Sequence, residues 1–463
     1  MQLTAAAVAA AAEGELVAGD PARTIDGFSI DSRTLAAGDL FLAIRGERFD
    51  GHRFVGAAFD RGAVGVVVDD ASAVARAPEG AIAIVVNETV VALQTLARHV
   101  RRASRAKVTA ITGSAGKTTT KEAAAAFLER KYAVFRNRGN LNNHIGLPLS
   151  LLELRHGPDM AVVELGMNHA GEISTLVAIA EPEVRVWTNV GPAHLEFFAS
   201  VDAIADAKAE IFEGARADDV LVANADDPLV MARARQFAGR VMTFGLASAA
   251  DVRAVSVRDL GLDGIEAELQ TPAGSVPLKC PLIGQANLAN VLAAAAVALQ
   301  FEIPLSDIST TTRTLRPMHH RGEVRRLSRG LTVIDDSYNS NPSALERAVR
   351  VVGGVRGQRR IAVIGEMLEL GDSSIALHEQ CGRAIAASGV DSLVTVGGEP
   401  ARALGRAAVN AGMSAVAVVH APTSVEAADV ISQLVTPGDV VLVKGSRGIR
   451  TETVVERLVA EWA

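Results

Sequence analysis

A glycine-rich turn between an apolar run and a helical pattern is the segment of this sequence best suited to bind phosphate. The run Ile-Thr-Gly-Ser-Ala-Gly-Lys-Thr-Thr occupies residues 111–119. The glycines allow backbone N–H groups to approach phosphate oxygens, Lys117 can reach the terminal phosphates, and Thr118 can hold Mg²⁺. The first glycine of the usual eight-residue pattern would fall at position 111, which is Ile, so this loop is a shorter variant. The predicted phosphate-binding residues are Gly113, Ser114, Ala115, Gly116, Lys117, Thr118 and Thr119.

Three later side chains are candidates for a metal site. Glu164 closes the apolar run Met-Ala-Val-Val-Glu, and a carboxylate at the carboxyl end of a strand beside such a loop can bind a metal or simply cap the next turn. His194 follows an apolar run, although a lone His is more often structural. Lys208 lies in a helical pattern, where a single Lys is usually a solvated surface group. These residues predict a metal site, with the structural alternatives open for each.

Polar groups farther along the chain suit the rest of a nucleotide. Asn287 and Asn290 begin a helical pattern and offer amide groups, and Arg321 adds a cation that can offset phosphate charge. Asp336 follows an apolar run, which is the usual place for a ribose-binding carboxylate. The alternatives are helix capping for Asn287, a surface ion pair for Arg321, and a turn made of Asp and Asn at 334–342.

The elements around the glycine loop form a pattern typical of a mostly parallel sheet covered by helices on both faces. The predicted strands of this segment are 108–112, 160–164, 184–189, 220–223 and 241–244. After Asp251 the runs shorten and alternate, as at 276–278, which indicates a few antiparallel strands. Residues 288–299 are predicted to form a buried, Ala-rich helix.

Two further α/β segments flank this one. The first contains a helix over Leu3 to Ala12 and short apolar runs at 40–44, 64–68 and 82–86. A helix over 89–102 begins the next domain, with Val91, Leu93, Leu96 and Val100 expected on one side. The third segment starts near Pro317, and its alternating pattern predicts a second doubly wound sheet with strands at 331–334, 360–364, 392–396, 415–419 and 440–443.

We therefore expect an α/β protein with three domains. The expected units are a small α/β N-terminal domain (1–86), a central P-loop-type domain with a mostly parallel sheet (87–315), and a C-terminal Rossmann-like domain (316–463). A chain of 463 residues is too long for one core, and 49% apolar with only 4% aromatic residues favours helices packed on sheets.

Composition also excludes several classes of protein. The net charge of −7 is spread without a basic stripe, so nucleic acid is not an expected partner. Cys280 and Cys381 lie far apart and outside any Cys-x-x-Cys pattern, which predicts two buried free thiols. No apolar run approaches the ~20 residues needed to cross a bilayer, so we expect no membrane insertion and a soluble, cytoplasmic protein.

Taken in chain order, these motifs resemble those of the Mur ligases of cell-wall precursor synthesis, along essentially the whole chain. The runs that carry the resemblance are Asp31 to Arg33, Gly46 to His52, Gly113 to Thr119, Asn142 to Pro148, Glu164 to Ile173, Pro192 to Glu196, Ala207 to Glu210, Asp335 to Pro342, Gly365 to Gly371 and Val443 to Gly448. The resemblance implies an ATP-dependent ligase that activates a carboxylate as an acyl phosphate, joins it to an amine, and releases ADP and phosphate. The implied substrates are UDP-N-acetylmuramoyl-tripeptide and D-alanyl-D-alanine. ATP and two Mg²⁺ ions are the implied cofactors, and we expect a monomer.

The resemblance also implies roles for individual residues. Lys117, Lys208 and Arg321 are the implied catalytic residues, with Thr118, Glu164, His194 and Lys208 around the metal. Lys208 resembles the family lysine that reacts with carbon dioxide to give a carbamate, which turns a cation into an anion. The implied ATP contacts are Asn287, Asn290, Arg321 and Asp336; the uridine nucleotide would lie near Ser32, Arg33, Gly46, Asp50 and His52, the muramyl peptide near Asn142 and Asn143, and the acceptor near Asn339, Asn341, Lys444 and Ser446.

Other activities fit the sequence less well. A ligase that adds a diamino acid would be expected to carry an Asp-Asn-Pro-Arg-type acceptor motif, which this sequence lacks. A folylpolyglutamate synthase usually lacks the uridine-binding first domain. A P-loop switch would not require His194, Lys208 or the whole third segment.

Overall fold

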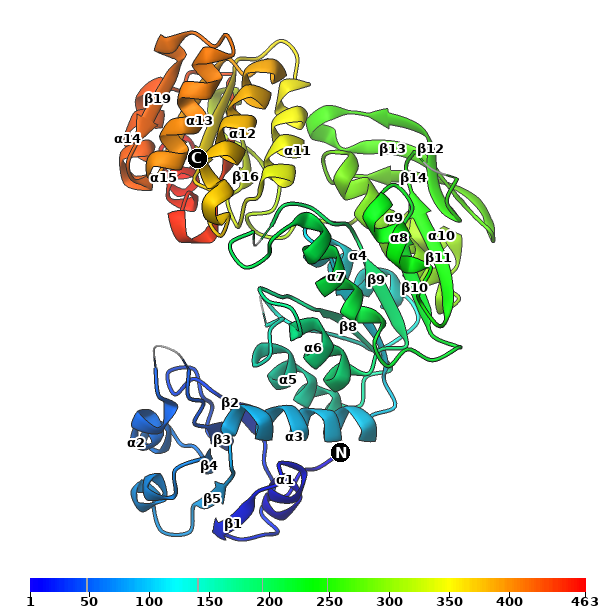
Figure 1. Ribbon diagram of the computed structural model, residues 1–463, viewed down its shortest axis with the longest axis vertical. Coiled ribbons are helices and arrows are strands. Elements are labelled where there is room, and N and C mark those ends of the chain that lie inside the picture. The colour runs from blue at the N-terminus through cyan, green and yellow to red at the C-terminus, as the bar shows by residue number, and fades with distance from the viewer. Residues whose placement is uncertain (47–48, 140, 194, 248) are drawn as a thin grey trace.

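The computed structural model describes residues 1–46, 49–139, 141–193, 195–247 and 249–463. Its described residues contain three separate sheets, one in each predicted segment. We call these segments the first region (1–86), the central region (87–315) and the third region (316–463). The first and third regions lie at opposite ends of the central region (Figure 1). The predicted α/β class with three sheet-containing regions is confirmed, whereas the boundary residues stay a prediction.

The first region is a small, mostly parallel sheet in the order β1-β5-β4-β3-β2, with β1 antiparallel to β5. Its strands are β1 (Glu15–Ala18), β2 (Gly27–Ser29), β3 (Asp39–Leu42), β4 (Gly65–Val68) and β5 (Ile82–Val85). Its helices are α1 (Ala5–Ala11) and α2 (Val55–Asp60). Side chains alternate across the sheet, so that Leu40 and Leu42 pack on α1 and Phe41 packs on α2.

The central region holds a larger sheet in the order β14-β13-β12-β11-β10-β9-β6-β8-β7. Its strands are β6 (Lys107–Thr112), β7 (Val134–Arg136), β8 (Met160–Glu164), β9 (Val184–Trp187), β10 (Val220–Asn224), β11 (Arg240–Gly245), β12 (Val252–Asp259), β13 (Ile265–Thr271) and β14 (Gly274–Cys280). Strands from β7 to β12 pair in parallel, and β12, β13 and β14 pair antiparallel, as predicted.

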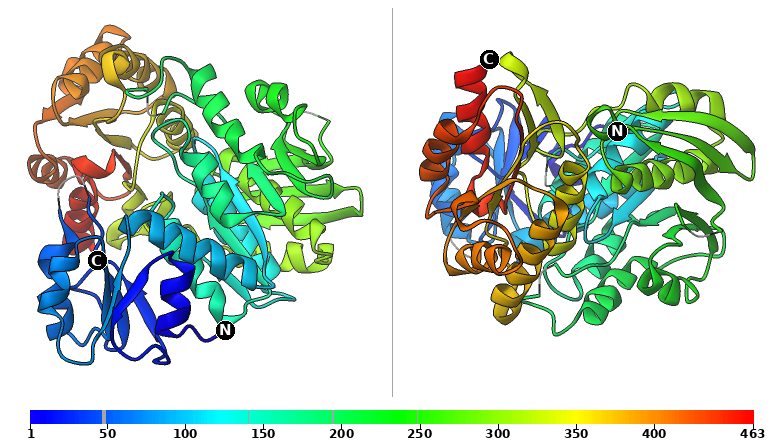
Figure 2. Two further views of the ribbon diagram at one scale, coloured as in Figure 1. Left: turned by 60° about the horizontal axis from the view of Figure 1, so that its bottom comes forward. Right: turned by 90° about the horizontal axis from the view of Figure 1, so that it is seen from above.

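Helices cover both faces of this central sheet, as the further views also show (Figure 2). The helices are α3 (Thr89–Ala103), α4 (Lys117–Leu128), α5 (Gly146–Leu151), α6 (Glu172–Ala180), α7 (Val201–Ala209), α8 (Pro228–Ala234), α9 (Gln285–Gln300) and α10 (Leu305–Thr312). Ala161 and Val163 of β8 join the core under α3, α5 and α6, while Met160 and Val162 join the core under α4 and α9. Burial on both faces explains why the strands read as unbroken apolar runs.

The third region is a second doubly wound sheet in the order β15-β16-β20-β17-β18-β19. Its strands are β15 (Glu323–Arg326), β16 (Thr332–Asp336), β17 (Arg360–Gly365), β18 (Ser392–Val396), β19 (Val418–Ala421) and β20 (Val440–Lys444). Its helices are α11 (Pro342–Gly353), α12 (Ser374–Ser388), α13 (Glu399–Asn410), α14 (Ser424–Leu434) and α15 (Glu452–Trp462). The carboxyl ends of β16 and β20 lie side by side, which places Asp336 opposite Lys444.

Contacts between the regions differ in kind. The first region shares a continuous apolar core with α3, α5 and α6 of the central region. The third region contacts the central one at separate points: Arg326 pairs with Asp263 at 2.7 Å, the Glu196 N–H donates to the Glu369 carbonyl at 3.1 Å, and Ile283 and Leu262 pack on the third-region core. The first region is therefore joined to the central one by a continuous apolar core, whereas the third region meets it at a mixture of polar and apolar contacts.

Three sequence expectations are corrected by the structure. Val91 is 55% exposed, because residues two apart on a helix face different sides and Leu93 points inward. The strand expected at 415–419 begins only at Val418, after a short 3₁₀ turn over Ala415–Ala417. The short strands β7 and β15 were not predicted, because three or four mixed residues carry no clear apolar period.

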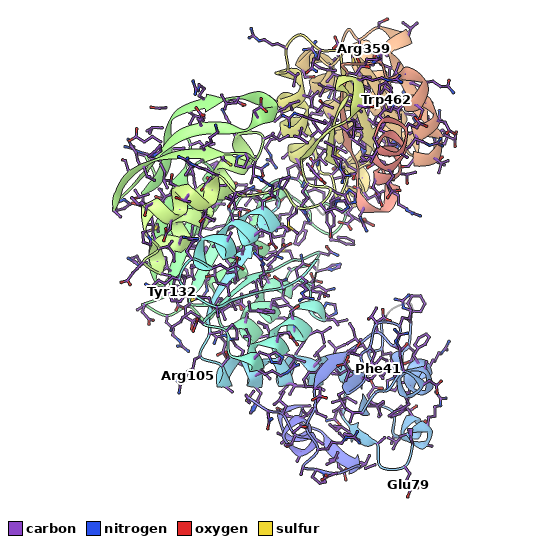
Figure 3. All side chains as sticks on the ribbon, turned by 180° about the vertical axis from the view of Figure 1, so that it is seen from behind. Phe41, Glu79, Arg105, Tyr132, Arg359 and Trp462 are labelled. Carbon is purple, nitrogen blue, oxygen red and sulfur yellow. The ribbon has the colours of Figure 1, made fainter. Side chains whose placement is uncertain are left out.

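The prediction for the two cysteines is confirmed. Both cysteines are buried free thiols. Among the described residues, we find no helix long and apolar enough to span a bilayer. Seen from behind, Phe41 lies inside the first region and Glu79 at its outer edge (Figure 3).

Candidate active site

The glycine turn lies between β6 and α4, as expected for a phosphate-binding loop. Gly113 and Gly116 have φ of +149° and +86°, values that side chains rarely allow. A side chain at Gly113 would collide with the Thr188 hydroxyl, and one at Gly116 would collide with the Asn290 amide. Glycine is therefore required at both positions, by backbone conformation and by space.

The N–H groups of this loop are not all available for a ligand. Ser114 N–H donates to the Asn189 carbonyl and Ala115 N–H donates to the Asn189 side-chain oxygen, both at 3.0 Å. The first turn of α4, which begins at Lys117, has N–H groups that lack intrahelical acceptors and carry the positive end of the helix dipole. Phosphate oxygens would therefore meet this turn, while Ser114 and Ala115 hold the loop in shape.

Lys117 is held across the mouth of the loop. Its Nζ donates to the Gly113 carbonyl at 2.8 Å, and its side chain is half-buried. Burial lowers the pKa of the Lys117 amine; Glu164 opposes that change and the positive charge of Arg321 adds to it. A phosphate group here would supply the negative charge that the protein itself provides only through Glu164.

Glu164 is fixed at the carboxyl end of β8, as predicted. Its carboxylate is 4% exposed and accepts from the Thr118 hydroxyl at 2.8 Å and from the Asn142 amide at 2.7 Å. Its backbone N–H donates to the side-chain oxygen of Asn137, and the backbone carbonyl of Asn137 accepts from the buried Lys121 amine at 2.6 Å. The turn-capping alternative for Glu164 is wrong, because the carboxylate accepts its hydrogen bonds from Thr118 and Asn142 at the phosphate loop and not from the turn after β8.

Lys208 lies on α7 and is only 2% exposed, so the surface alternative for this residue is wrong. Burial lowers the pKa of its amine well below the usual range, and the positive charge of Lys117 lowers it further. Within the residues that the structure describes, no hydrogen bond or ion pair of its amine is found. An amine in this setting favours the neutral, nucleophilic form.

Two of the four predicted metal ligands lie beside the phosphate loop. Thr118 and Glu164 present two oxygens beside the phosphate loop, a donor type that suits Mg²⁺. His194 lies outside the described residues, and no cluster of three or more His, Cys, Asp or Glu suited to a metal occurs in the rest. Lys208 could join oxygen ligands only after gaining an acidic group. The oxygens present fit Mg²⁺ bound with nucleotide phosphates and water rather than in a cage made of protein alone.

A cavity of about 780 Å³ lies between the central and third regions and brings most of the predicted residues together. The predicted residues that line it are Ser114, Ala115, Gly116, Lys117, Thr118, Thr119, Asn142, Asn143, Glu164, Asn287, Asn290, Arg321, Asp336, Asn339, Asn341 and Lys444. Gly113, Lys208 and Ser446 do not line it. Its position agrees with the rule that ligands bind at the carboxyl ends of parallel strands.

The amide groups of α9 connect this cavity to the loop. Asn290 lies directly against Gly116, and its side chain donates to Asn287 at 3.4 Å. Asn287 in turn donates to the Ile283 carbonyl at 2.9 Å. Helix capping of the kind considered for Asn287 is not seen, because Gly284 occupies the position before the helix.

Cations stacked on one aromatic ring form the third-region wall. The guanidinium carbon of Arg321 lies 4.1 Å from the centre of the Tyr338 ring, and that of Arg447 lies 5.4 Å from it. Arg347 and Arg350 of α11 line the same cavity. Tyr338 and these three additional arginines were not singled out from the sequence. Arg447 belongs to the run Val443 to Gly448, which carries part of the family resemblance, so the sequence could have identified this residue.

Several predicted acceptor residues are already engaged within the third region. Lys444 is 2% exposed and donates to Asp336 at 2.7 Å and to the Asn339 carbonyl at 3.0 Å. Asn341 caps α11 by accepting from the Ala344 N–H. Ser446 is 3% exposed and accepts from the Leu368 N–H at 3.0 Å. These groups shape the wall and leave little free capacity for a ligand.

The candidate residues of the first region lie apart from the cavity. Arg33 makes two hydrogen bonds to Asp31, which lower the pKa of that carboxyl to about 2, while most of the arginine side chain is exposed. Asp50 accepts from His52 at 2.7 Å, and His52 is buried and also accepts from the Asp69 N–H.

The two remaining candidates of the first region differ in exposure and bonding. The Gly46 N–H donates to the Phe49 carbonyl at 2.9 Å, and Ser32 is half-buried. Of this set, Arg33 and Gly46 are exposed, Ser32 and Asp50 are half-buried, and His52 is buried.

Comparisons with known proteins agree with this architecture. Family models described as the Mur ligase catalytic domain, the Mur ligase middle domain and the Mur ligase glutamate ligase domain match residues 24–130, 111–298 and 320–447, respectively. The chain is 33% identical over 439 residues to the UDP-N-acetylmuramoyl-tripeptide--D-alanyl-D-alanine ligase of Bacillus subtilis, covering 94% of this chain and 93% of that protein.

Solved structures show the same likeness in three dimensions. A crystal structure of MurF from Acinetobacter baumannii has a TM-score of 0.89 at 33% identity and covers 99% of both chains. A MurF ligase from Thermotoga maritima in complex with ADP has a TM-score of 0.81 at 28% identity, covering 94% of this chain and 97% of that one.

Proposed function

Because this chain belongs to the Mur ligase family, we propose that it uses ATP to join D-alanyl-D-alanine to UDP-N-acetylmuramoyl-tripeptide, a step of peptidoglycan precursor synthesis. The observation that carries this proposal is the shared cavity, where the phosphate loop and Glu164 face the arginines of the third region. Relatives that match over nearly the whole chain carry this activity in their names.

The reaction needs activation because a carboxylate does not acylate an amine at neutral pH. A carboxylate oxygen of the tripeptide attacks the γ-phosphorus of ATP, the bond to the β-phosphate oxygen breaks, and ADP leaves. The dipeptide amine then attacks the acyl carbon, loses a proton, and displaces phosphate. Lys117 and Arg321, which approach the loop from opposite walls, offset the negative charge that accumulates as the phosphoryl group is transferred.

Magnesium completes this charge balance in the proposal. Thr118 and Glu164 would hold it, with His194 and a carbamate on Lys208 providing for a second ion. Bound Mg²⁺ would neutralise the phosphate oxygens. The lowered pKa of Lys208 supports the carbamate, since a neutral amine can attack the carbon of CO₂ and then release a proton.

We assign the remaining contacts by position. Asn287, Asn290 and Asp336 line the cavity and would contact ATP, with Asp336 at the ribose; Asn142 and Asn143 would face the muramyl peptide. Ser32 and Arg33 would meet the uridine nucleotide, with Gly46, Asp50 and His52 shaping the loop beside it. Asn339 and Asn341 would border the acceptor, while Lys444 and Ser446 support that wall.

The three expected domains would then divide the work. Residues 1–86 would bind the uridine nucleotide, 87–315 would bind ATP, and 316–463 would bring the acceptor. Because an acyl phosphate hydrolyses readily, closure of the third region over ATP would exclude water. Both walls of the cavity come from one chain, which supports a monomer, and dependence on ATP supports a cytoplasmic location.

Coupled phosphate release tests this proposal. The purified protein with MgATP is mixed with UDP-N-acetylmuramoyl-tripeptide and then with D-alanyl-D-alanine or single amino acids. We expect steady release of phosphate only when both the tripeptide and the dipeptide are present. Steady release with ATP alone would favour a nucleotide switch, and preference for a free diamino acid would favour a different ligase of the family.

A further inference from the structure

We propose that Arg447 binds the terminal carboxylate of the acceptor dipeptide and thereby selects an acceptor with a free carboxyl end. This inference rests on the proposed function and assigns a residue to acceptor recognition. Arg447 follows β20 at the carboxyl end of the third-region sheet, and its side chain lines the shared cavity.

The neighbouring polar groups cannot take this role without losing bonds they already make. The Lys444 amine is committed to Asp336 and to the Asn339 carbonyl, and it is almost fully buried. Ser446 supports the backbone at Leu368 and does not line the cavity. Recognition of an anion by either residue would leave a buried partner unpaired, which is costly.

The guanidinium N–H groups of Arg447, in contrast, are accessible to a ligand. Its side chain is 63% exposed, and its ion pair with Glu452 is long, at 3.9 Å. The ring of Tyr338 lies beneath the guanidinium group, which restrains the plane of the group while its N–H edge stays free. A guanidinium edge matches the two oxygens of a carboxylate and can bind both at once.

Arg447 also shares one wall of the cavity with Arg321. Arg321 and Arg447 lie near the same Tyr338 ring, at 4.1 and 5.4 Å from its centre, and the charge of Arg321 acts on Lys117 at the phosphate loop. An extended dipeptide spans about 7 Å. A dipeptide held by Arg447 would extend along this wall, with its amine toward the acyl phosphate beside Arg321.

The other arginines of the cavity have apolar neighbours on their own helix. Arg347 and Arg350 project from α11 beside Ala344, Ala348 and Val351. That apolar surface suits a flat base more than a small charged peptide. Arg447 is consequently the arginine best placed for the acceptor.

A pair of acceptors tests the proposal directly. The first is D-alanyl-D-alanine and the second is D-alanyl-D-alaninamide, which keeps the amine and removes the terminal charge. For the unmodified protein we expect kcat/KM to favour the free dipeptide by roughly tenfold to a hundredfold, the range of one charge-assisted contact. In Arg447→Met this preference should fall close to one, mainly through a higher KM for the dipeptide, with the KM for ATP retained.

Two further variants make the result interpretable. Arg450→Met removes an equal charge from the same loop, at an exposed residue that does not line the cavity, and should keep the full preference. Arg447→Lys keeps the charge without the paired N–H geometry and should give an intermediate preference. Equal loss on both acceptors in Arg447→Met, or a preference kept in full, would overturn the assignment.

Failure of the proposed ligase function would give a different result from failure of the Arg447 assignment. If the unmodified protein ligated neither acceptor, the proposed function itself would fall. If it ligated the dipeptide and Arg447→Met kept the preference, only the role of Arg447 would fall.

Discussion

The lysines of the central wall and the arginines of the third-region wall are held in different ways. On the central side, Lys117 is half-buried beside the phosphate loop and Lys208 is buried behind it, and burial lowers the pKa of both amines. On the third-region side, Arg321 and Arg447 stack on Tyr338, and Arg447 is largely exposed. Lys208 is enclosed by protein and Lys117 reaches the cavity with a lowered pKa, whereas the third-region arginines line the cavity as guanidinium groups stacked on a ring.

This difference indicates a division of roles. A buried lysine can lose its proton, so its charge depends on its surroundings, whereas a guanidinium group stays charged at any physiological pH. The central wall also holds Thr118 and Glu164 in fixed hydrogen bonds, as a preorganised site requires. We therefore expect large catalytic effects from changes to the central wall and smaller effects on binding from changes to the third-region wall.

The largest effect is expected from Lys117→Met. The variant keeps the aliphatic chain but removes the cation nearest the phosphate loop, so kcat should fall by about a thousandfold, as for other groups that stabilise transferring phosphoryl oxygens. Rates of phosphate release with saturating substrates measure the loss. Lys131→Met, at an exposed lysine paired with Glu302, is the control and should keep full activity. A loss below tenfold for Lys117→Met would mean that the central wall does not carry the chemistry.

Glu164→Gln should have the next largest effect. The amide is similar in size but lacks the negative charge, so the metal-binding oxygens beside Thr118 are weakened and kcat should fall roughly a hundredfold at low Mg²⁺. Titration of activity with MgCl₂ should show a higher half-saturating concentration and partial recovery at high Mg²⁺. An unchanged Mg²⁺ dependence would remove Glu164 from the metal site and weaken the contrast between the walls.

The variant Lys208→Met tests the comparison of the two walls through the pH dependence of the free energy of unfolding. Because the pKa of Lys208 is lowered in the folded state, the unfolded chain binds a proton that the folded chain does not, between the folded pKa and the ordinary value of 10.5. Stability from this group therefore rises with pH through that window and is lost as pH falls toward the folded pKa. Relative to Lys208→Met, the unmodified protein should gain stability as pH rises from 7 toward 10, by at most about 1.4 kcal/mol per pH unit.

Urea unfolding in buffer free of CO₂, at several pH values, measures this difference. The absence of CO₂ keeps the amine unmodified, so the titration reports its burial together with the positive charge of Lys117. If the free energy of unfolding of the two proteins changed with pH in the same way, Lys208 would have an ordinary pKa in the folded state. The contrast between lysines with a lowered pKa and arginines that stay charged would then rest on Lys117 alone.

Much of the central wall was predictable from sequence because its groups follow strands directly. Gly113 to Thr119 succeed β6 and Glu164 ends β8, so the order of parallel strands brings them to one edge of the sheet. Lys208 was ambiguous in sequence, since burial of a helix residue depends on how α7 packs. Its desolvation becomes visible only in three dimensions.

The third-region wall was harder to predict for a physical reason. Its character depends on which polar side chains satisfy each other, and the sequence does not show that Lys444 pairs with Asp336 or that Ser446 supports Leu368. Arg347 and Arg350 lie on α11, where the helical pattern gives their side but not the wall they face. Pairing across separate segments, not local pattern, decides which of these groups remain free.

The smallest effect is expected from Arg350→Met, at the exposed edge of the third-region wall. Exposed charges interact weakly and are screened by salt, so MgATP binding should weaken about two- to threefold at low ionic strength and little at about 0.5 M salt. Isothermal titration calorimetry at two salt concentrations measures both values, with Arg356→Met on the far loop of α11 as a control of equal charge. A larger loss that persists in high salt would reveal a direct, desolvated contact with ATP, and the third-region wall would then share the fixed character of the central one.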